Sequence, residues 1–233
     1  MKNFEVEKYT PSATITENFE PMLSIIRPLL ASAIAIFSVA TPALAHHALG
    51  GRQPINFGEG FFSGLAHPII NFDHFAFIVA VGVFAAVTQA SKFQPVWFVG
   101  GTILGCLLML SGNAIPFNAW LVHAALLALG LALAFGKPCM RFVDTGAFVL
   151  AGILHGGLYA QAIVGSVTVS ISGYLLGFAI IQAVVATGAM FAAFMLWRGD
   201  ELYANARVVG GMVAGVGLTV MVQAGVAAMF PNL

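Results

Sequence analysis

Residues 64–88 read GLAHPIINFDHFAFIVAVGVFAAVT, an apolar run that contains a small cluster of polar side chains. A helix needs about 20 apolar residues to cross a bilayer core about 30 Å thick. His67, Asn71, Asp73 and His74 lie inside this run, and ionisable side chains at membrane depth usually face a bundle interior or an aqueous cavity. The stretch therefore predicts a membrane-spanning helix that carries a polar site.

The composition of the whole chain agrees with a membrane protein. Of the 233 residues, 60% are hydrophobic and only 8% are charged, whereas an average soluble domain has about 25% charged residues. The formal net charge is +0 and no basic cluster is present, which argues against nucleic-acid binding. Cys106 and Cys139 lack a CxxC spacing, so we expect neither a disulfide framework nor a zinc knuckle.

The N-terminal region has the pattern of an export signal. Residues 1–22 are polar, Arg27 precedes the apolar stretch 28–40, and Ala43-Leu44-Ala45 has small residues where a signal peptidase cuts. We expect an extension and signal peptide over residues 1–45, followed by a domain over residues 46–233. Because the polar segment before Arg27 is long, an uncleaved anchor is the alternative.

The rest of the chain predicts an all-α fold, a polytopic transmembrane bundle of about six helices after the signal peptide. Short connections separate the apolar runs. The predicted spans are 64–88, 95–112, 118–136, 144–165, 172–197 and 206–230.

The positive charges predict the orientation of these spans. If the mature N-terminus is exported, the loops with Lys92, with Lys137 and Arg141, and with Arg198 and Arg207 all face the cytoplasm. We therefore expect an integral protein of the bacterial inner (plasma) membrane, in contact with lipid, with a periplasmic mature N-terminus.

The first and fourth spans share a weak echo, Gly64-Leu65-Ala66-His67-Pro68 and Gly152-Ile153-Leu154-His155-Gly156. These spans would run in opposite directions, as in transporters built from two inverted halves with the substrate site at their interface. Chance similarity between helices rich in small residues is the alternative.

The polar cluster of the first span suggests metal chemistry. His67, Asn71 and His74 follow one stripe of a helix, but His67 and His74 would be about 10 Å apart along a straight axis. Either the helix breaks near Pro68 or the two imidazoles serve successive positions on a path. Imidazoles with one carboxylate, Asp73, suit borderline transition metals; structural polar residues that join helices are the alternative.

Five further candidates lie outside the first span. His123 is in the third predicted span, and His155 and Gln161 are in the fourth. His46-His47 would begin the mature chain and could donate an amine and two imidazoles to a metal, unless the pair is incidental to the cleavage site.

The segment His67-Pro68-Ile69-Ile70-Asn71-Phe72-Asp73-His74, followed by Val81-Gly82, resembles the signature of the HupE/UreJ family of nickel and cobalt permeases. The predicted signal peptide and six-helix body are also similar to that family. The resemblance implies a secondary permease that takes up nickel or cobalt.

The second motif of that family, Phe-His-Gly-x-Ala-His-Gly-x-Glu, falls on residues 154–162, where only His155 and Gly156 match. Tyr159 and Ala162 replace the second His and the Glu, and Ala119 occupies a position that is usually acidic. His123, one turn from Ala119, and Gln161 are the residues that could compensate.

We therefore predict a permease for Ni²⁺ or Co²⁺ rather than an enzyme, with the metal as cargo and no prosthetic group. The predicted metal ligands are His67, Asp73, His74, His155, His46 and His47, and the predicted pathway residues are Asn71, His123, Tyr159 and Gln161. No GxxxxGK[ST] motif is present for ATP binding. Two alternatives remain: a non-transporting membrane subunit that binds a partner complex or pigment, and an intramembrane metalloenzyme. Self-association into a homo-oligomer or with a membrane partner is left open.

Overall fold

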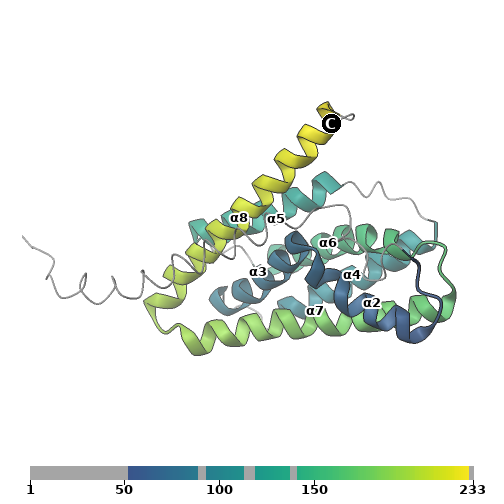
Figure 1. The fold of residues 1–233 in the computed structure, drawn as a ribbon. Coiled ribbons are helices and arrows are strands. Elements are labelled where there is room, and N and C mark those ends of the chain that lie inside the picture. The colour runs from purple at the N-terminus through teal and green to yellow at the C-terminus, as the bar shows by residue number, and fades with distance from the viewer. Residues whose placement is uncertain (1–51, 89–92, 113–118, 137–140, 231–233) are drawn as a thin grey trace, which may run out of the picture. The chain divides into compact units, whose positions relative to one another are not determined.

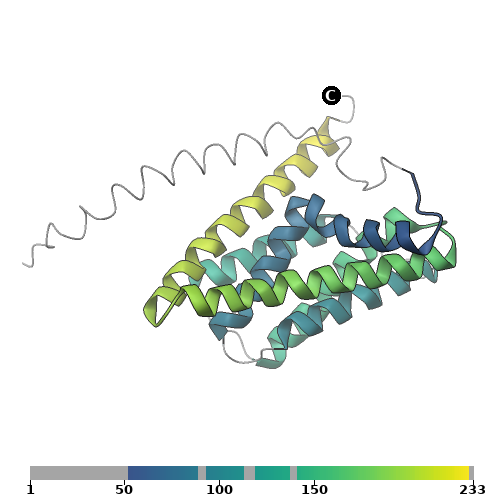
Figure 2. The same ribbon diagram turned by 60° about the horizontal axis from the view of Figure 1, so that its bottom comes forward.

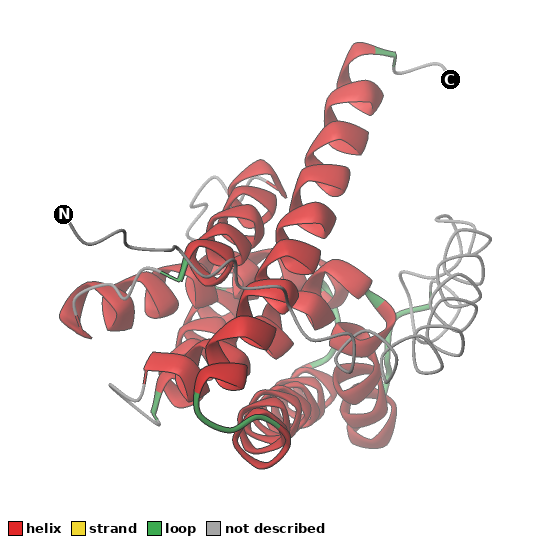
Figure 3. Ribbon diagram, turned by 90° about the vertical axis from the view of Figure 1, so that its left-hand side faces the viewer, coloured by secondary structure: helices red, strands yellow, loops and turns green. Residues whose placement is uncertain are grey.

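The structure is a computed structural model that describes residues 52–88, 93–112, 119–136 and 141–230, with only the backbone of residues 141–143. Within these ranges every regular element is a helix (Figure 3), so the predicted all-α class is confirmed. Residues 44–233 belong to one compact unit. The predicted signal peptide, His46 and His47 lie outside the described residues.

The described helices follow the predicted apolar runs closely. They are α2 Phe57–Ile70, α3 Phe72–Thr88, α4 Gln94–Leu110, α5 Ala119–Phe135, α6 Arg141–Ala160, the 3₁₀ turn η1 Gln161–Ile163, α7 Thr168–Leu196 and α8 Asp200–Met229.

Two boundaries differ from the prediction. The first helix starts at Phe57 rather than at residue 64, because the Asn56 side chain caps it by accepting a hydrogen bond of 2.8 Å from the backbone N–H of Glu59. The last helix starts at Asp200, so the charged residues before residue 206 form its first turns instead of a loop.

Three described helices are long and apolar enough to cross a membrane: Asp144–Ile163, Thr168–Leu196 and Asp200–Met229. The pair α2 and α3 passes the same test as one bent span, with an angle of 81° between the two helices. The helices α4 and α5 are apolar but shorter, at 17 residues each. The structure therefore has three to four candidate spans by length and composition, and the number six stays a prediction.

The helices pack as three close pairs: α2 with α7, α4 with α6, and α5 with α8. Figures 1 and 2 show α7 running beside α2, and Figure 1 shows α5 beside α8. Each pair meets through glycines whose missing side chains let two backbones touch. A Cβ atom added to Gly64 would collide with the carbonyl oxygen of Tyr174, and one added to Gly105 with that of Ile153.

The helix α3 lies at the centre of this arrangement. It packs against α4, α5, α7 and α8, and most of its residues are buried. Its apolar side chains, including Phe77, Val81 and Phe84, form the main core cluster together with Leu126 and Leu133 of α5.

The outer faces of the long helices are apolar. On α7, Val184 and Phe191 are 59% and 64% exposed, and on α8, Met212 and Leu218 are 57% and 56% exposed. Such a continuous exposed apolar surface is unfavourable in water but suits the lipid around a transmembrane bundle.

The glycine contacts predict unequal effects for two neighbouring substitutions in α4. Gly105→Val would force the side chain into the Ile153 carbonyl, whereas a Cβ at Gly100 meets nothing within 4 Å. Overpacking typically costs about 1–3 kcal/mol, so Gly105→Val should lower the thermal unfolding midpoint in detergent. The matched Gly100→Val variant should stay close to the parent, and equal midpoints for the two variants would contradict this packing.

Candidate metal-binding cavity

A break at Asn71 positions the predicted ligands. Pro68 lies inside α2 and has no N–H to donate to the Gly64 carbonyl, which weakens the helix at this point. Asn71 then ends α2, because its side-chain Nδ2 donates to the His67 carbonyl at 2.9 Å. The Asn71 carbonyl in turn accepts from the Phe75 N–H at 2.9 Å, which starts α3.

The bend brings His67 and His74 together. Their ring centroids are 6.3 Å apart, whereas a straight helix would separate them by about 10 Å along its axis. A break near Pro68 was one of the two alternatives that the sequence left open, and the structure has the break three residues later, at Asn71.

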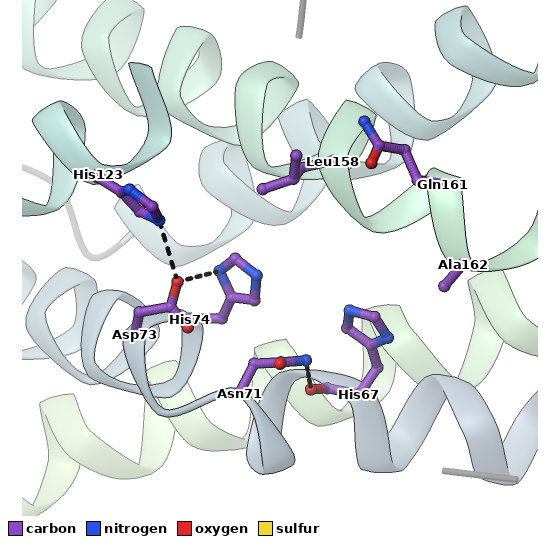
Figure 4. Close-up of a pocket in the computed structure, with 8 residues that line it drawn as sticks. All are labelled: His67, Asn71, Asp73, His74, His123, Leu158, Gln161 and Ala162. Carbon is purple, nitrogen blue, oxygen red and sulfur yellow. Dashed lines mark hydrogen bonds and ion pairs between the residues drawn. The ribbon is translucent and has the colours of Figure 1, made fainter. Parts of the chain in front are cut away.

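The two imidazoles face a polar cavity of about 460 Å³ (Figure 4). At roughly 30 Å³ per water, the six waters of a hydrated divalent ion occupy about 180 Å³, so the cavity can admit such an ion with its hydration shell. The lining residues come from α2, α3, α5, α6 and η1, and are His67, Asn71, Asp73, His74, His123, Leu158, Gln161 and Ala162.

Asp73 links two of the histidines. Its Oδ2 lies 3.7 Å from Nδ1 of His74 and 3.8 Å from Nε2 of His123, as the dashed lines in Figure 4 show. The side chain of Asp73 remains 21% exposed, more than either histidine. Asp73 is therefore the lining carboxylate, placed where it can attract a cation from water and hold the two imidazoles nearby.

Tyr159 and His155 lie behind the cavity wall rather than in it. The Tyr159 ring is fully buried, with its centroid 4.4 Å from His74 and 5.2 Å from His67. His155 is 1% exposed and its ring centroid lies 4.2 Å from Phe77.

The orientation of His155 follows from one hydrogen bond. Its Nδ1 lies 2.7 Å from the Ala151 carbonyl, which can only accept, so we assign the proton to Nδ1. The Nε2 atom is then the one with a free lone pair.

The predicted residues thus divide into three groups. Six line the cavity: His67, Asn71, Asp73, His74, His123 and Gln161. His155 and Tyr159 support it from behind, and His46 and His47 lie outside the described residues. The sequence did not single out Leu158 or Ala162 as lining residues, because apolar side chains carry no such signal.

Two buried polar residues, Asp144 and Gln182, lie outside the cavity lining. Asp144, the first residue of the predicted span 144–165, lies on α6 and is 4% exposed, so the described helices bury an acid that the sequence analysis did not single out. Gln182 of α7 is fully buried and donates to the Thr102 hydroxyl at 3.1 Å and the Phe178 carbonyl at 3.2 Å. A lone amide within an apolar run was the available signal for Gln182.

The cavity does not have the geometry of a tight metal centre. Over the residues that the structure describes, no group of three or more His, Cys, Asp or Glu side chains converges so as to hold an ion. The arrangement instead places separate nitrogen and oxygen atoms from several helices around the cavity.

Taken together, the apolar helices and the polar cavity define an integral membrane protein with a candidate small-ion site. The sequence model for the family described as HupE / UreJ protein matches residues 34–220. The match covers most of the chain, and the chain belongs to the HupE/UreJ family. This is a transporter-type family associated with nickel and cobalt. No curated protein and no solved structure matches the chain significantly.

The dual role of Asn71 predicts a stability effect. Asn71→Ala removes the side-chain bond to the His67 carbonyl and should cost about 1 kcal/mol, as loss of one intramolecular hydrogen bond typically does. Thermal unfolding in detergent should show a lower midpoint for this variant. Ile70→Ala, at the same break but 40% exposed, is the control, and an equal loss in both variants would argue against the cap.

Proposed function

We propose that this protein is a permease that moves a divalent transition metal ion, Ni²⁺ or Co²⁺, across the membrane. The observation that carries the proposal is the bend at Asn71, which gathers His67, His74 and Asp73 on one polar cavity within an otherwise apolar chain. Ionisable side chains at membrane depth are costly and usually mark a substrate or ion pathway.

The donor chemistry supports this cargo. Imidazole nitrogens suit nickel, cobalt, zinc and copper, and the absence of a lining thiolate among the described residues reduces the preference for copper(I) and zinc. Asp73 supplies the negative charge that first attracts the ion. Asn71, His123 and Gln161 offer further oxygen or nitrogen atoms, so that protein ligands replace waters one at a time.

A loose site suits transport better than storage. An ion that is bound by a complete set of ligands leaves slowly, and conduction requires binding weak enough for release. The separated donors of this cavity match that requirement. A membrane potential that is negative inside contributes about 2.3 kcal/mol per charge per 100 mV, which favours inward movement of a divalent cation without a coupled ion.

The proposed setting is the bacterial inner membrane, with the mature N-terminus in the periplasm. In this orientation α2 enters from the periplasm and the cavity is reached from that side. His155 is proposed as a ligand that the ion reaches after His74, because the two rings are 5.7 Å apart. We also propose that His46 and His47, at the mature N-terminus, bind the ion before it enters the cavity.

A non-transporting subunit on the same scaffold is the second candidate. The observation in its favour is that no three donors converge on one point among the described residues. Such a subunit would bind a partner protein or pigment without moving metal.

Uptake of radioactive Ni²⁺ and Co²⁺ into metal-starved cells tests the proposal. Cells that express the parent should show saturable uptake, and His67→Ala, Asp73→Asn and His74→Ala should each lose most of it at matched membrane levels, because each removes a donor from the cavity. Asp200→Asn, which neutralises an exposed acid in the first turn of α8, should transport like the parent.

A second measurement separates binding from movement. Co²⁺ titrated into the purified parent should produce a visible absorption band from nitrogen and oxygen ligation, weakened in the three cavity variants. Uptake at the level of empty cells, with the parent correctly inserted, would reject the permease and favour the subunit.

A further inference from the structure

The glycine contacts of two helix pairs repeat each other. In the pair α2 and α7, and again in the pair α6 and α4, four glycines press on four backbone positions of the partner helix. Two constant shifts in residue number, +92 from α2 to α6 (60 to 152) and −72 from α7 to α4 (170 to 98), convert every contact of the first pair into one of the second. The matched contacts are Gly60 on Ser170 with Gly152 on Phe98, Gly64 on Tyr174 with Gly156 on Thr102, Gly173 on Phe57 with Gly101 on Val149, and Gly177 on Phe61 with Gly105 on Ile153.

The third helix pair is its own counterpart. A Cβ on Gly130 of α5 would collide with Ala214 of α8, and one on Gly210 of α8 with Ala134 of α5. If Gly130 of α5 is made equivalent to Gly210 of α8, then Ala134 is equivalent to Ala214, and each of the two contacts becomes the other. Because the residue number rises along α5 as it falls along the facing part of α8, the two helices are antiparallel, and the halves that contain them have inverted topology.

These contacts give the internal repeat a register different from the one suggested by the sequence echo. The echo aligned His67 with His155, whereas the contacts make Gly64 of one half equivalent to Gly156 of the other. In that register His67 corresponds to Tyr159, and the two rings meet with centroids 5.2 Å apart. Contact between equivalent residues is expected where an axis relates two halves.

The helix α3 has no counterpart among the described helices, and its two ends lie at different cavities. Its first residues, Asp73 and His74, line the polar cavity together with His123 of α5. Its last residues, Val87 and Thr88, line a second cavity of about 170 Å³ together with Tyr203 of α8. The correspondence of Gly130 with Gly210 also pairs His123 with Tyr203, so equivalent positions of the two halves flank opposite ends of α3.

The second cavity is smaller and more apolar than the first. Its volume is about 170 Å³, against about 460 Å³ for the polar cavity, and apolar residues make up most of its lining. Its polar side chains are the hydroxyls of Thr88 and Tyr203, and no carboxylate or imidazole lines it within the described residues. The Arg207 guanidinium lies beside Gly136 of the lining, so this end does not hold a cation tightly. Core side chains of α3, including Phe77, Val81 and Phe84, separate it from the polar cavity.

From this arrangement we propose that the second cavity is the inner vestibule of the transport path, and that the two inverted halves exchange conformations to widen it. The inference rests on the proposed permease function. The occupant is the same divalent cation, which regains its waters there because the lining hydroxyls hold it weakly. In inverted repeats the substrate site lies at the repeat interface, and rocking of one half against the other exposes it alternately.

Cysteine labelling tests the vestibule directly. In a Cys106→Ala, Cys139→Ser background, Ala132→Cys places a thiol on the lining of the second cavity. Leu131→Cys, its neighbour on α5 and 39% exposed on the apolar surface, is the matched control. In inside-out vesicles a water-soluble maleimide should label Ala132→Cys several-fold faster when Ni²⁺ or Co²⁺ is added, and Leu131→Cys should remain slow with or without metal.

Labelling of the polar cavity tests whether the two halves exchange conformations. Ala162→Cys places a thiol on the lining of the polar cavity, and the maleimide should reach it from the opposite side of the membrane. Added Ni²⁺ or Co²⁺ should slow the labelling of Ala162→Cys while it speeds the labelling of Ala132→Cys. If Ala132→Cys labels no faster than Leu131→Cys under any condition, while its uptake is intact, the vestibule is rejected and the permease stands. Absence of uptake in the unmodified, correctly inserted parent would instead reject the permease.

Filling the second cavity with a larger side chain provides a test without labelling. Ala132→Phe should lose most uptake yet keep the Co²⁺ absorption band, because the polar cavity is untouched. Leu131→Phe should keep both. Intact uptake in Ala132→Phe would overturn the inference, and the retained band shows that a variant without uptake is folded.

Discussion

Close contact between helix backbones is the constraint on which the rest of this structure depends. In a bilayer the helices gain little from burying apolar side chains, because lipid is as apolar as the helix surface, so association relies on packing. Here that packing comes from glycines placed where two backbones touch, as at Gly64 with Tyr174 and Gly156 with Thr102. The paired helices α2 with α7, α4 with α6 and α5 with α8 surround α3, whose position is fixed because its neighbours cannot separate without losing those contacts.

The site exists because one helix in this frame is interrupted. Without the break at Asn71, His67 and His74 would occupy successive levels of a straight helix; with it, their rings lie 6.3 Å apart on one cavity. Asn71 compensates for the interruption, since its side chain and its own carbonyl satisfy backbone groups on both sides of the bend. Broken helices are tolerated within a membrane where the freed backbone is satisfied by the protein or lines a cavity, and both conditions hold here.

The sequence predicted the helical class, the apolar runs and most of the cavity lining, because these follow from hydropathy and from rare polar residues in apolar spans. The polar side chains of residues 67–74 were informative because few other titratable groups occur in the spans. The sequence could not predict that His155 lies behind His74 rather than on the wall, since this depends on how Phe77 and Phe98 pack around it. Nor could it give the correct register of the internal repeat, because the equivalent residues share glycines at helix crossings rather than matching side chains, and His67 faces a tyrosine.

The contrast between the two cavities follows from the asymmetry of an otherwise repeated structure. The helix pairs are interchangeable in their contacts, but α3 occurs once, and it carries Asp73 and His74 only at its first turn. In the proposed permease, one end of the central helix attracts and coordinates the cation, while the other end offers hydroxyls beside the Arg207 guanidinium. A path with donors at both ends would retain the ion, and a path with donors at neither would not select it. On this proposal, a single inserted helix with polar side chains at one end gives a symmetric scaffold one place for binding and a different place for release.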